Sequence, residues 1–160
     1  MKSTLMKRHV DVNELEQYSR RNCLRVFGVE ETKEENPEEI IMNLAKGQLG
    51  ITTITPDDIE RTHRVGRPTE GRPRAIIVQF MGYKMRNKFI QNRRKLKGTK
   101  IVVKEDLTYR NQQLLKTTQE HRGTDNAWSK DGKIFAHFVK DGEKIIRRIK
   151  DLEDLEKYSK

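Results

Sequence analysis

Arginine and lysine side chains are concentrated in one stretch near the middle of the chain. Residues 61–100 contain 13 of them and a single acid, Glu70, which gives a net charge of +12. Residues 1–60 carry a net charge of −4 and residues 101–160 one of +2. Such a block of like charge favours a polyanionic partner, and nucleic acid is the leading candidate. The alternative is a solvated basic surface that has no partner.

Arginine suits this chemistry because its planar guanidinium group donates two parallel hydrogen bonds to phosphate oxygens and also stacks on bases. Contacts with the phosphate backbone carry no sequence information. We therefore expect binding with little sequence preference and a bias toward single strands.

The rest of the composition limits the class of protein. The chain has 160 residues, enough for one domain or two small ones, and its 33% hydrophobic residues are clustered. The single cysteine, Cys23, excludes an internal disulfide and fits a reducing, intracellular compartment. No apolar run approaches the ~20 residues needed to cross a bilayer, so we expect no membrane partner. Residues 1–20 lack the apolar core of a signal peptide.

Sequence patterns typical of catalysis are missing. The four histidines show no metal-ligand spacing, and no nucleophile motif, phosphate-binding glycine loop or cofactor fingerprint occurs. We interpret the paired acids Glu105 and Asp106 as capping or orienting the helix that follows them. Trp128 and Tyr109 are favoured as core residues over a base-stacking role. We expect a non-catalytic protein with no metal and no cofactor.

Residues 22–104 predict the element order strand–helix–strand–strand–helix–strand. The clearest elements are the helix that begins at Asn36-Pro37, the buried strand 75–80 and the amphipathic helix 84–96. Two crossover helices would pack on one face of a sheet and leave its other face open for a ligand.

The residues that precede this unit, 1–21, are expected to form a short helix. Its apolar residues Leu5, Val12, Leu15 and Tyr18 recur at spacings compatible with the end of a coiled coil. A frayed lead-in helix is the alternative.

The chain on the C-terminal side predicts a small α+β unit. Thr108 would cap a helix, turns at Asp131-Gly132 and Asp141-Gly142 would join three strands, and a last helix would follow. The expected domains are an N-terminal helix (1–21), a βαββαβ domain (22–107) and a small C-terminal domain (108–160).

Five sequence runs occur in a characteristic order within residues 14–150, namely LEQYSRRNCLRVFGVEE, ENPEEIIMNLA, DIERTHRVGR, RPRAIIVQF and LKGTKIVVKEDLT. In these runs the chain resembles the protein encoded by the first open reading frame of LINE-type, non-LTR retrotransposons. It is also similar to the related baculovirus FP proteins.

This resemblance implies a particular fold and role. The fold would be an RRM-like βαββαβ sandwich, followed by a small C-terminal α+β domain and preceded by a coiled coil through which the family trimerises. The role would be that of a nucleic-acid chaperone that binds single-stranded RNA or DNA in a retrotransposon ribonucleoprotein particle. The implied location is cytoplasmic, with the nucleus as the alternative.

An ordinary RRM stacks bases on aromatic residues of its two central strands. Here the corresponding positions hold Arg25, Ala75 and Ile77, so Phe27 is the only aromatic residue expected on that face. This matches the retrotransposon family, which binds mainly through arginine and lysine. The candidate nucleic-acid-binding residues are Arg25, Arg61, Arg64, Arg67, Arg72, Arg74, Arg93, Arg94, Lys95, Lys97 and Arg110.

Two other functions stay open. The first is a pseudo-RRM adaptor that binds proteins, not nucleic acid, through its helices or its sheet face. The second is a nucleic-acid enzyme, which would need several acids converging on a metal, whereas residues 61–100 contain only Glu70.

Overall fold

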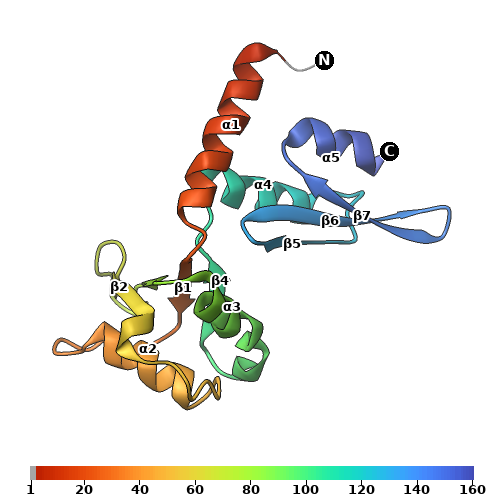
Figure 1. Cartoon of the computed structure of the whole chain (residues 1–160). Coiled ribbons are helices and arrows are strands. Elements are labelled where there is room, and N and C mark those ends of the chain that lie inside the picture. The colour runs from red at the N-terminus through yellow and green to blue at the C-terminus, as the bar shows by residue number, and fades with distance from the viewer. Residues whose placement is uncertain (1–2) are drawn as a thin grey trace. The chain divides into compact units, whose positions relative to one another are not determined.

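A computed structural model describes residues 3–160 and divides the chain into two compact units. The central unit comprises Asn22–Asp106, and the terminal unit comprises Met1–Arg21 together with Leu107–Lys160. Each unit contains helices and one antiparallel sheet, so the predicted α+β class is confirmed (Figure 1). None of the described helices is both long and apolar enough to cross a bilayer.

The central unit has a four-stranded sheet in the order β2-β3-β1-β4. Every neighbouring pair of strands is antiparallel. The chain forms the elements in the predicted order, and their bounds are β1 (Cys23–Phe27), α2 (Pro37–Lys46), a 3-10 turn η1 (Pro56–Asp58), β2 (Ile59–Arg64), β3 (Ile76–Phe80), α3 (Tyr83–Gln91), a second 3-10 turn η2 (Arg93–Leu96) and β4 (Val102–Glu105).

Helices α2 and α3 cover one face of this sheet (Figure 1). Strand residues alternate between the two faces, and those on the covered face, such as Leu24, Val26 and Val78, are fully buried. Phe80 and Phe89 meet there with ring centroids 5.4 Å apart. The helix start predicted at Asn36 is confirmed, because its side chain accepts hydrogen bonds from the first turn of α2.

The amphipathic helix predicted for residues 84–96 is interrupted. The α-helix ends at Gln91, and Asn92 donates a side-chain hydrogen bond of 2.7 Å to the carbonyl oxygen of Lys88. The Asn92 backbone N–H also donates to this carbonyl, at 3.2 Å, and the chain continues beyond it as the separate turn η2. Leu96 still reaches the core, as predicted.

The terminal unit contains a three-stranded meander covered by helices. Its elements are α1 (Thr4–Ser19), α4 (Tyr109–Glu120), β5 (Asn126–Lys130), β6 (Lys133–Lys140), β7 (Glu143–Ile149) and α5 (Leu152–Ser159). The strands lie in the order β5-β6-β7 (Figure 1). Asp131 and Asp141 have φ of 51°, and each precedes a glycine with positive φ, as the predicted Asp-Gly turns require.

Helix α1 belongs to the terminal unit, whereas the sequence predicts a separate N-terminal helix for residues 1–21, of which Met1 and Lys2 lie outside the described residues. Polar contacts attach it. The side-chain amide oxygen of Gln17 accepts hydrogen bonds from the Thr108 backbone N–H at 2.8 Å and from the Asn111 side chain at 3.0 Å. A side chain at Gly132 would lie 2.6 Å from Gln17 Cγ, so only glycine allows this approach.

The apolar stripe of α1 takes no part in this attachment. Leu5, Val12, Leu15 and Tyr18 are each more than 60% exposed. The sequence therefore predicts the helix and its apolar stripe correctly, but the face that contacts the rest of the terminal unit is the polar one.

Candidate nucleic-acid interface

The second face of the central sheet is open to solvent and mixes charge with apolar surface. Strand register places His63, Ile77, Arg25 and Lys104 in one row across all four strands. Arg61 lies on the same face, opposite Gln79. Arg25 and Ile77 thus occupy the face predicted for them, in the two central strands where an RNA-binding sheet ordinarily presents aromatic rings.

Phe27 is the aromatic residue of β1 on this open face, and it is 36% exposed. The Lys104 ammonium group lies 5.6 Å from the centroid of its ring, a cation–π arrangement. Val102 is the residue opposite Phe27, and it is also exposed. The open face therefore offers one phenyl ring and the His63 imidazole beside apolar and cationic groups.

The acids Glu105 and Asp106 pair with arginines of the central unit. Asp106 accepts a hydrogen bond of 2.8 Å from Arg25, and Glu105 forms a buried ion pair with Arg86. The N-cap of α4 is Thr108, as predicted, because its hydroxyl accepts from the Asn111 backbone, so neither acid supplies that cap. The pairing with Asp106 partly neutralises the Arg25 guanidinium.

Arg64 has the most constrained guanidinium group among the candidate residues. Its side chain is only 5% exposed, and it donates to both carboxylate oxygens of Glu35 at 2.7 and 2.8 Å. It also donates to the backbone carbonyls of Val29, Glu30 and Arg74 at 2.6–2.9 Å. All three of its nitrogen atoms are engaged, so Arg64 would have to leave this position to bind a phosphate.

Arg74 forms a second pair beside it, with Glu31. Its Nε and Nη2 atoms lie 2.9–3.0 Å from the carboxylate, and Nη1 donates to the Gly66 carbonyl at 3.0 Å. The hydrogen bonds from Arg74 lower the pKa of Glu31, and those from Arg64 lower the pKa of Glu35. The hydrogen bonds between Arg74 and Glu31 also raise the pKa of the Arg74 guanidinium group.

We call these four residues, Arg64, Glu35, Arg74 and Glu31, the arginine–glutamate cluster. It joins the acidic loop after β1 to the end of β2 and the chain before β3. Part of the positive charge of residues 61–100 is therefore neutralised by acids that lie about 30 to 40 positions away in the sequence. Linear charge counting cannot detect this.

Three other candidate arginines remain exposed near the cluster. Arg61 lies on β2, and Arg67 and Arg72 lie in the loop between β2 and β3. That loop is irregular apart from a single bridge between Thr69 and Arg72. Their guanidinium groups are accessible to a ligand.

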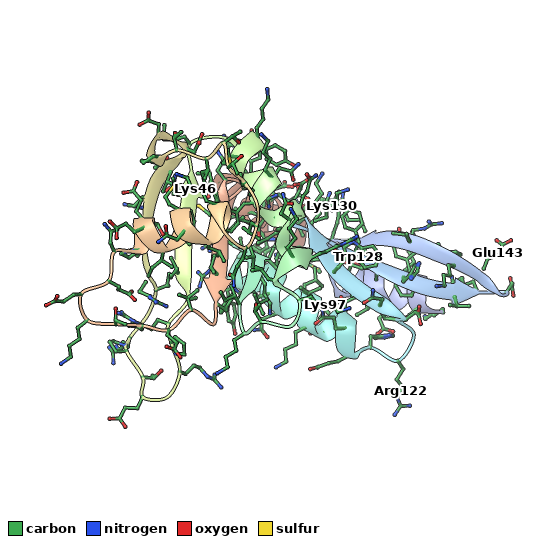
Figure 2. The ribbon with its side chains drawn as sticks, turned by 90° about the horizontal axis from the view of Figure 1, so that it is seen from below. Lys46, Lys97, Arg122, Trp128, Lys130 and Glu143 are labelled. Carbon is green, nitrogen blue, oxygen red and sulfur yellow. The ribbon has the colours of Figure 1, made fainter. Side chains whose placement is uncertain are left out.

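The largest group of exposed candidate cations lies where α3 gives way to η2. We call Arg93, Arg94, Lys95 and Lys97 the basic helix end; Figure 2 labels Lys97. Arg93 reaches the Val103 carbonyl at 3.4 Å and Lys95 the Leu49 carbonyl at 3.2 Å. Within residues 3–160, none of the four forms an ion pair with a carboxylate. Their charge is available to an anionic ligand.

The remaining candidate, Arg110, belongs to the terminal unit. It is half-buried on α4 and lines an apolar hollow with Tyr109, Leu114 and Leu152. Tyr109 is 76% exposed, so its predicted core role is wrong. Nothing places Arg110 with the cations of the central unit.

Trp128 also lies outside the core predicted for it. It is half-buried on the outer face of the β5–β7 sheet, whereas Ala127 and Ile134 are buried on the other face. Phe135 and His137 share that outer face. Sequence reasoning missed this group, although the alternation of apolar residues along IFAHF at 134–138 places Phe135 and His137 opposite Ile134, Ala136 and Phe138.

The described residues contain no cluster of three or more histidine, cysteine, aspartate or glutamate side chains able to hold a metal ion. No protein-family model matches the chain, and no curated protein matches it in sequence.

Proposed function

We propose that the chain binds single-stranded RNA or DNA without catalysing a reaction, mainly through contacts of arginine and lysine with the phosphate backbone. The basic helix end carries this proposal. It gathers four exposed cations within five positions, and no described acid neutralises them. Desolvating or crowding like charges costs free energy, which bound phosphates offset.

The fold of the central unit supports the same class of ligand. Its βαββαβ element order and its strand order β2-β3-β1-β4 are those expected of an RRM-like domain. Arg25 and Ile77 stand where base-stacking aromatic residues would stand. Binding through the backbone, with little sequence preference, is therefore favoured over base recognition on this sheet.

The resemblance to the first-open-reading-frame proteins of LINE-type retrotransposons extends the proposal. A protein of that type would coat its transcript as a ribonucleoprotein particle and act as a nucleic-acid chaperone. Weak, exchangeable phosphate contacts suit a chaperone, because they hold strands without fixing one base-paired arrangement.

Self-association through a longer coiled coil, of which α1 would form the end, is part of this proposal. The exposed stripe of Leu5, Val12 and Leu15 on α1 supports it, because the polar face of the same helix already contacts the terminal unit. Apolar residues at these spacings are typical of a coiled-coil seam. Sedimentation of the wild-type chain and of a Leu5→Asp, Val12→Asp variant would test for assembly.

A protein-binding adaptor is the second candidate. Phe27, Val102 and Ile77 give the open face of the central sheet an apolar patch that a partner protein could cover. This role requires no affinity for nucleic acid, so one binding measurement separates the two candidates.

The test is a salt titration of binding to labelled single-stranded and double-stranded RNA and DNA. If about five phosphates are contacted, log K should fall against log salt with a slope of roughly −3.5 on single strands. Single strands should bind more tightly than duplexes. An affinity independent of salt, or no binding to any of the four ligands, would remove the proposal and favour the adaptor.

A further inference from the structure

The outer face of the β5–β7 sheet carries aromatic rings that the core of the terminal unit does not use. Along β6, Ile134, Ala136 and Phe138 point into the core and are at most 1% exposed. Phe135 and His137 point to the other side and are half-buried. Trp128 on β5 pairs with Phe135, so it shares this side (Figure 2 labels Trp128).

The rings of Trp128, Phe135 and His137, which we call the aromatic face, form one contiguous group. Trp128 and Phe135 are nearly parallel, with an interplanar angle of 20° and centroids 6.3 Å apart. His137 meets Trp128 edge-on at 5.9 Å. These contacts hold the rings in fixed orientations, so a ligand that stacks on them would lose little side-chain entropy from the protein.

Cations surround the aromatic face. Lys130 and Lys133 are directly opposite each other across β5 and β6, on the same side as the rings. Lys144 and Arg148 of β7 also lie on this side. Two acids moderate the charge, since Glu14 pairs with Arg148 at 3.1 Å and Asp125 lies 3.6 Å from His137. Like charges directly opposite in a sheet are destabilising, and an anionic ligand would relieve this repulsion.

We propose that the aromatic face stacks the unpaired bases of single-stranded nucleic acid while the lysines around it contact the phosphates. The proposal rests on the function proposed above and assigns base contacts to the terminal unit. Aromatic rings bordered by cations are the combination with which proteins bind single strands without reading sequence. The surrounding lysines disfavour a cationic ligand, such as a methylated lysine, in the same place.

The sheet of the terminal unit would thus supply what the central sheet lacks. Every base has a π-face, so stacking adds affinity for all sequences equally. A duplex keeps its bases stacked on each other, so the aromatic face would bind only unpaired strands. This would give the chain a preference for single strands that phosphate contacts alone do not provide.

The single tryptophan makes the proposal directly testable, because Trp128 is the only one in the chain. The probe is oligothymidylate of about 15 nucleotides, compared with an abasic oligonucleotide of equal length and charge. Anisotropy of a label on the strand measures binding, and Trp128 emission measures stacking. We expect oligothymidylate to quench Trp128 strongly and the abasic strand to leave its emission nearly unchanged.

A variant removes the ring while keeping an apolar side chain. Phe135→Leu should weaken binding of oligothymidylate about tenfold and leave binding of the abasic strand unchanged. Phe135→Tyr, which keeps an aromatic ring at this position, should bind oligothymidylate with the affinity of the wild type. The matched control is Tyr109→Leu, which removes an exposed ring of the same unit from α4 and should have no effect. Unchanged circular dichroism spectra and melting temperatures show that each variant is folded.

The outcomes separate this proposal from the one on which it rests. If both strands bind equally, Trp128 emission stays constant and Phe135→Leu binds as the wild type does, the aromatic face is no binding site, although the protein still binds nucleic acid. If anisotropy shows no binding to either strand by the wild type, both proposals fail. If Tyr109→Leu weakens binding as much as Phe135→Leu does, the assignment to this face is wrong.

Discussion

The two compact units carry the same formal charge, yet they offer a nucleic acid different groups. Each contains 17 arginine and lysine residues and 12 acids. The central unit pairs several of its arginines with carboxylates, as in the arginine–glutamate cluster, and Phe27 and His63 on the open face of its sheet lie on different strands. The terminal unit places Trp128, Phe135 and His137 together on its sheet.

Because the two units have equal net charge, net charge alone does not distinguish their candidate binding surfaces. Two quantities distinguish them: how many cations lack a carboxylate partner, and whether aromatic rings lie beside them. In the central unit the first criterion selects the basic helix end over Arg64 and Arg74. In the terminal unit the second selects the outer face of the β5–β7 sheet.

The largest effect expected is on stability, from Arg64→Ala. Removing Arg64 leaves the partly buried Glu35 carboxylate and three backbone carbonyls without their donor, and should cost about 3 kcal/mol. Thermal melts by circular dichroism would report the loss. Trp128 lies in the terminal unit, so the melting temperature followed by its fluorescence should fall less than the one followed by circular dichroism. Arg61→Ala on the same strand is the matched control and should stay within about 0.5 kcal/mol of wild type. Equal melting of the two variants would contradict the structural role of Arg64.

A slightly smaller effect, on affinity, is expected at the basic helix end. Replacing Arg93, Arg94, Lys95 and Lys97 by alanine should weaken binding to single strands about hundredfold at moderate salt, because each lost phosphate contact removes a counterion-release term. The salt slope should become shallower in proportion. Fluorescence anisotropy measures both.

The control for this variant removes the same charge elsewhere. Lys7, Arg8, Lys116 and Arg122 are exposed residues of the terminal unit, and their replacement by alanine also removes four positive charges. If this control loses as much affinity as the first variant, overall charge and not the basic helix end governs binding.

A pH-dependent loss of stability is expected in the central unit. Arg64 and Arg74 hold the pKa values of Glu35 and Glu31 below the ordinary value of 4.5. A carboxyl group whose pKa is lower in the folded state stabilises that state above its unfolded pKa. This contribution is lost as the pH falls from about 4.5 through the folded values. Urea melts at a series of pH values would measure the loss.

Glu35→Gln is the control for the pH series. It removes one of the two titrating carboxyls, so the variant should be less stable at neutral pH and its stability should depend less on pH below 4.5. An unchanged pH dependence would show that other groups determine the acid sensitivity.

The smallest effect is expected from Phe27→Ala. This is the only phenyl ring on the open face of the central sheet, and it already contacts Lys104. Its loss should weaken binding by less than about threefold, below the 1–3 kcal/mol typical of a dedicated stacking residue. A loss greater than that of Phe135→Leu would move the base-stacking site to the central sheet.

Local sequence patterns predict most of the elements but not their partners. Alternation identifies β1 and β3, Asn36 and Thr108 predict helix starts, and the Asp-Gly pairs predict the turns of the meander. These signals depend on neighbouring residues only, which is why sequence is sufficient for them.

The failures share one cause, which is dependence on residues distant in sequence. Arg64 counts as an exposed cation until Glu35, 29 positions away, is known to lie beside it. Gln17 of α1 has no apolar character, and contacts with the distant residues Thr108, Asn111 and Gly132 give it a buried position. Trp128 is large and apolar, so composition favours the core, whereas strand register places it outside.

The attachment of α1 by Gln17 has a consequence for the order of synthesis. The terminal unit is discontinuous, because the 85 residues of the central unit are inserted between α1 and Leu107. The two ends of that insertion meet where Leu24 pairs with Glu105, so the central unit can be completed on the ribosome first. Helix α1 is synthesised before the central unit, whereas Asn111 and Gly132, which contact its Gln17, are synthesised after it. Helix α1 therefore leaves the ribosome before the central unit but packs into the terminal unit only after it.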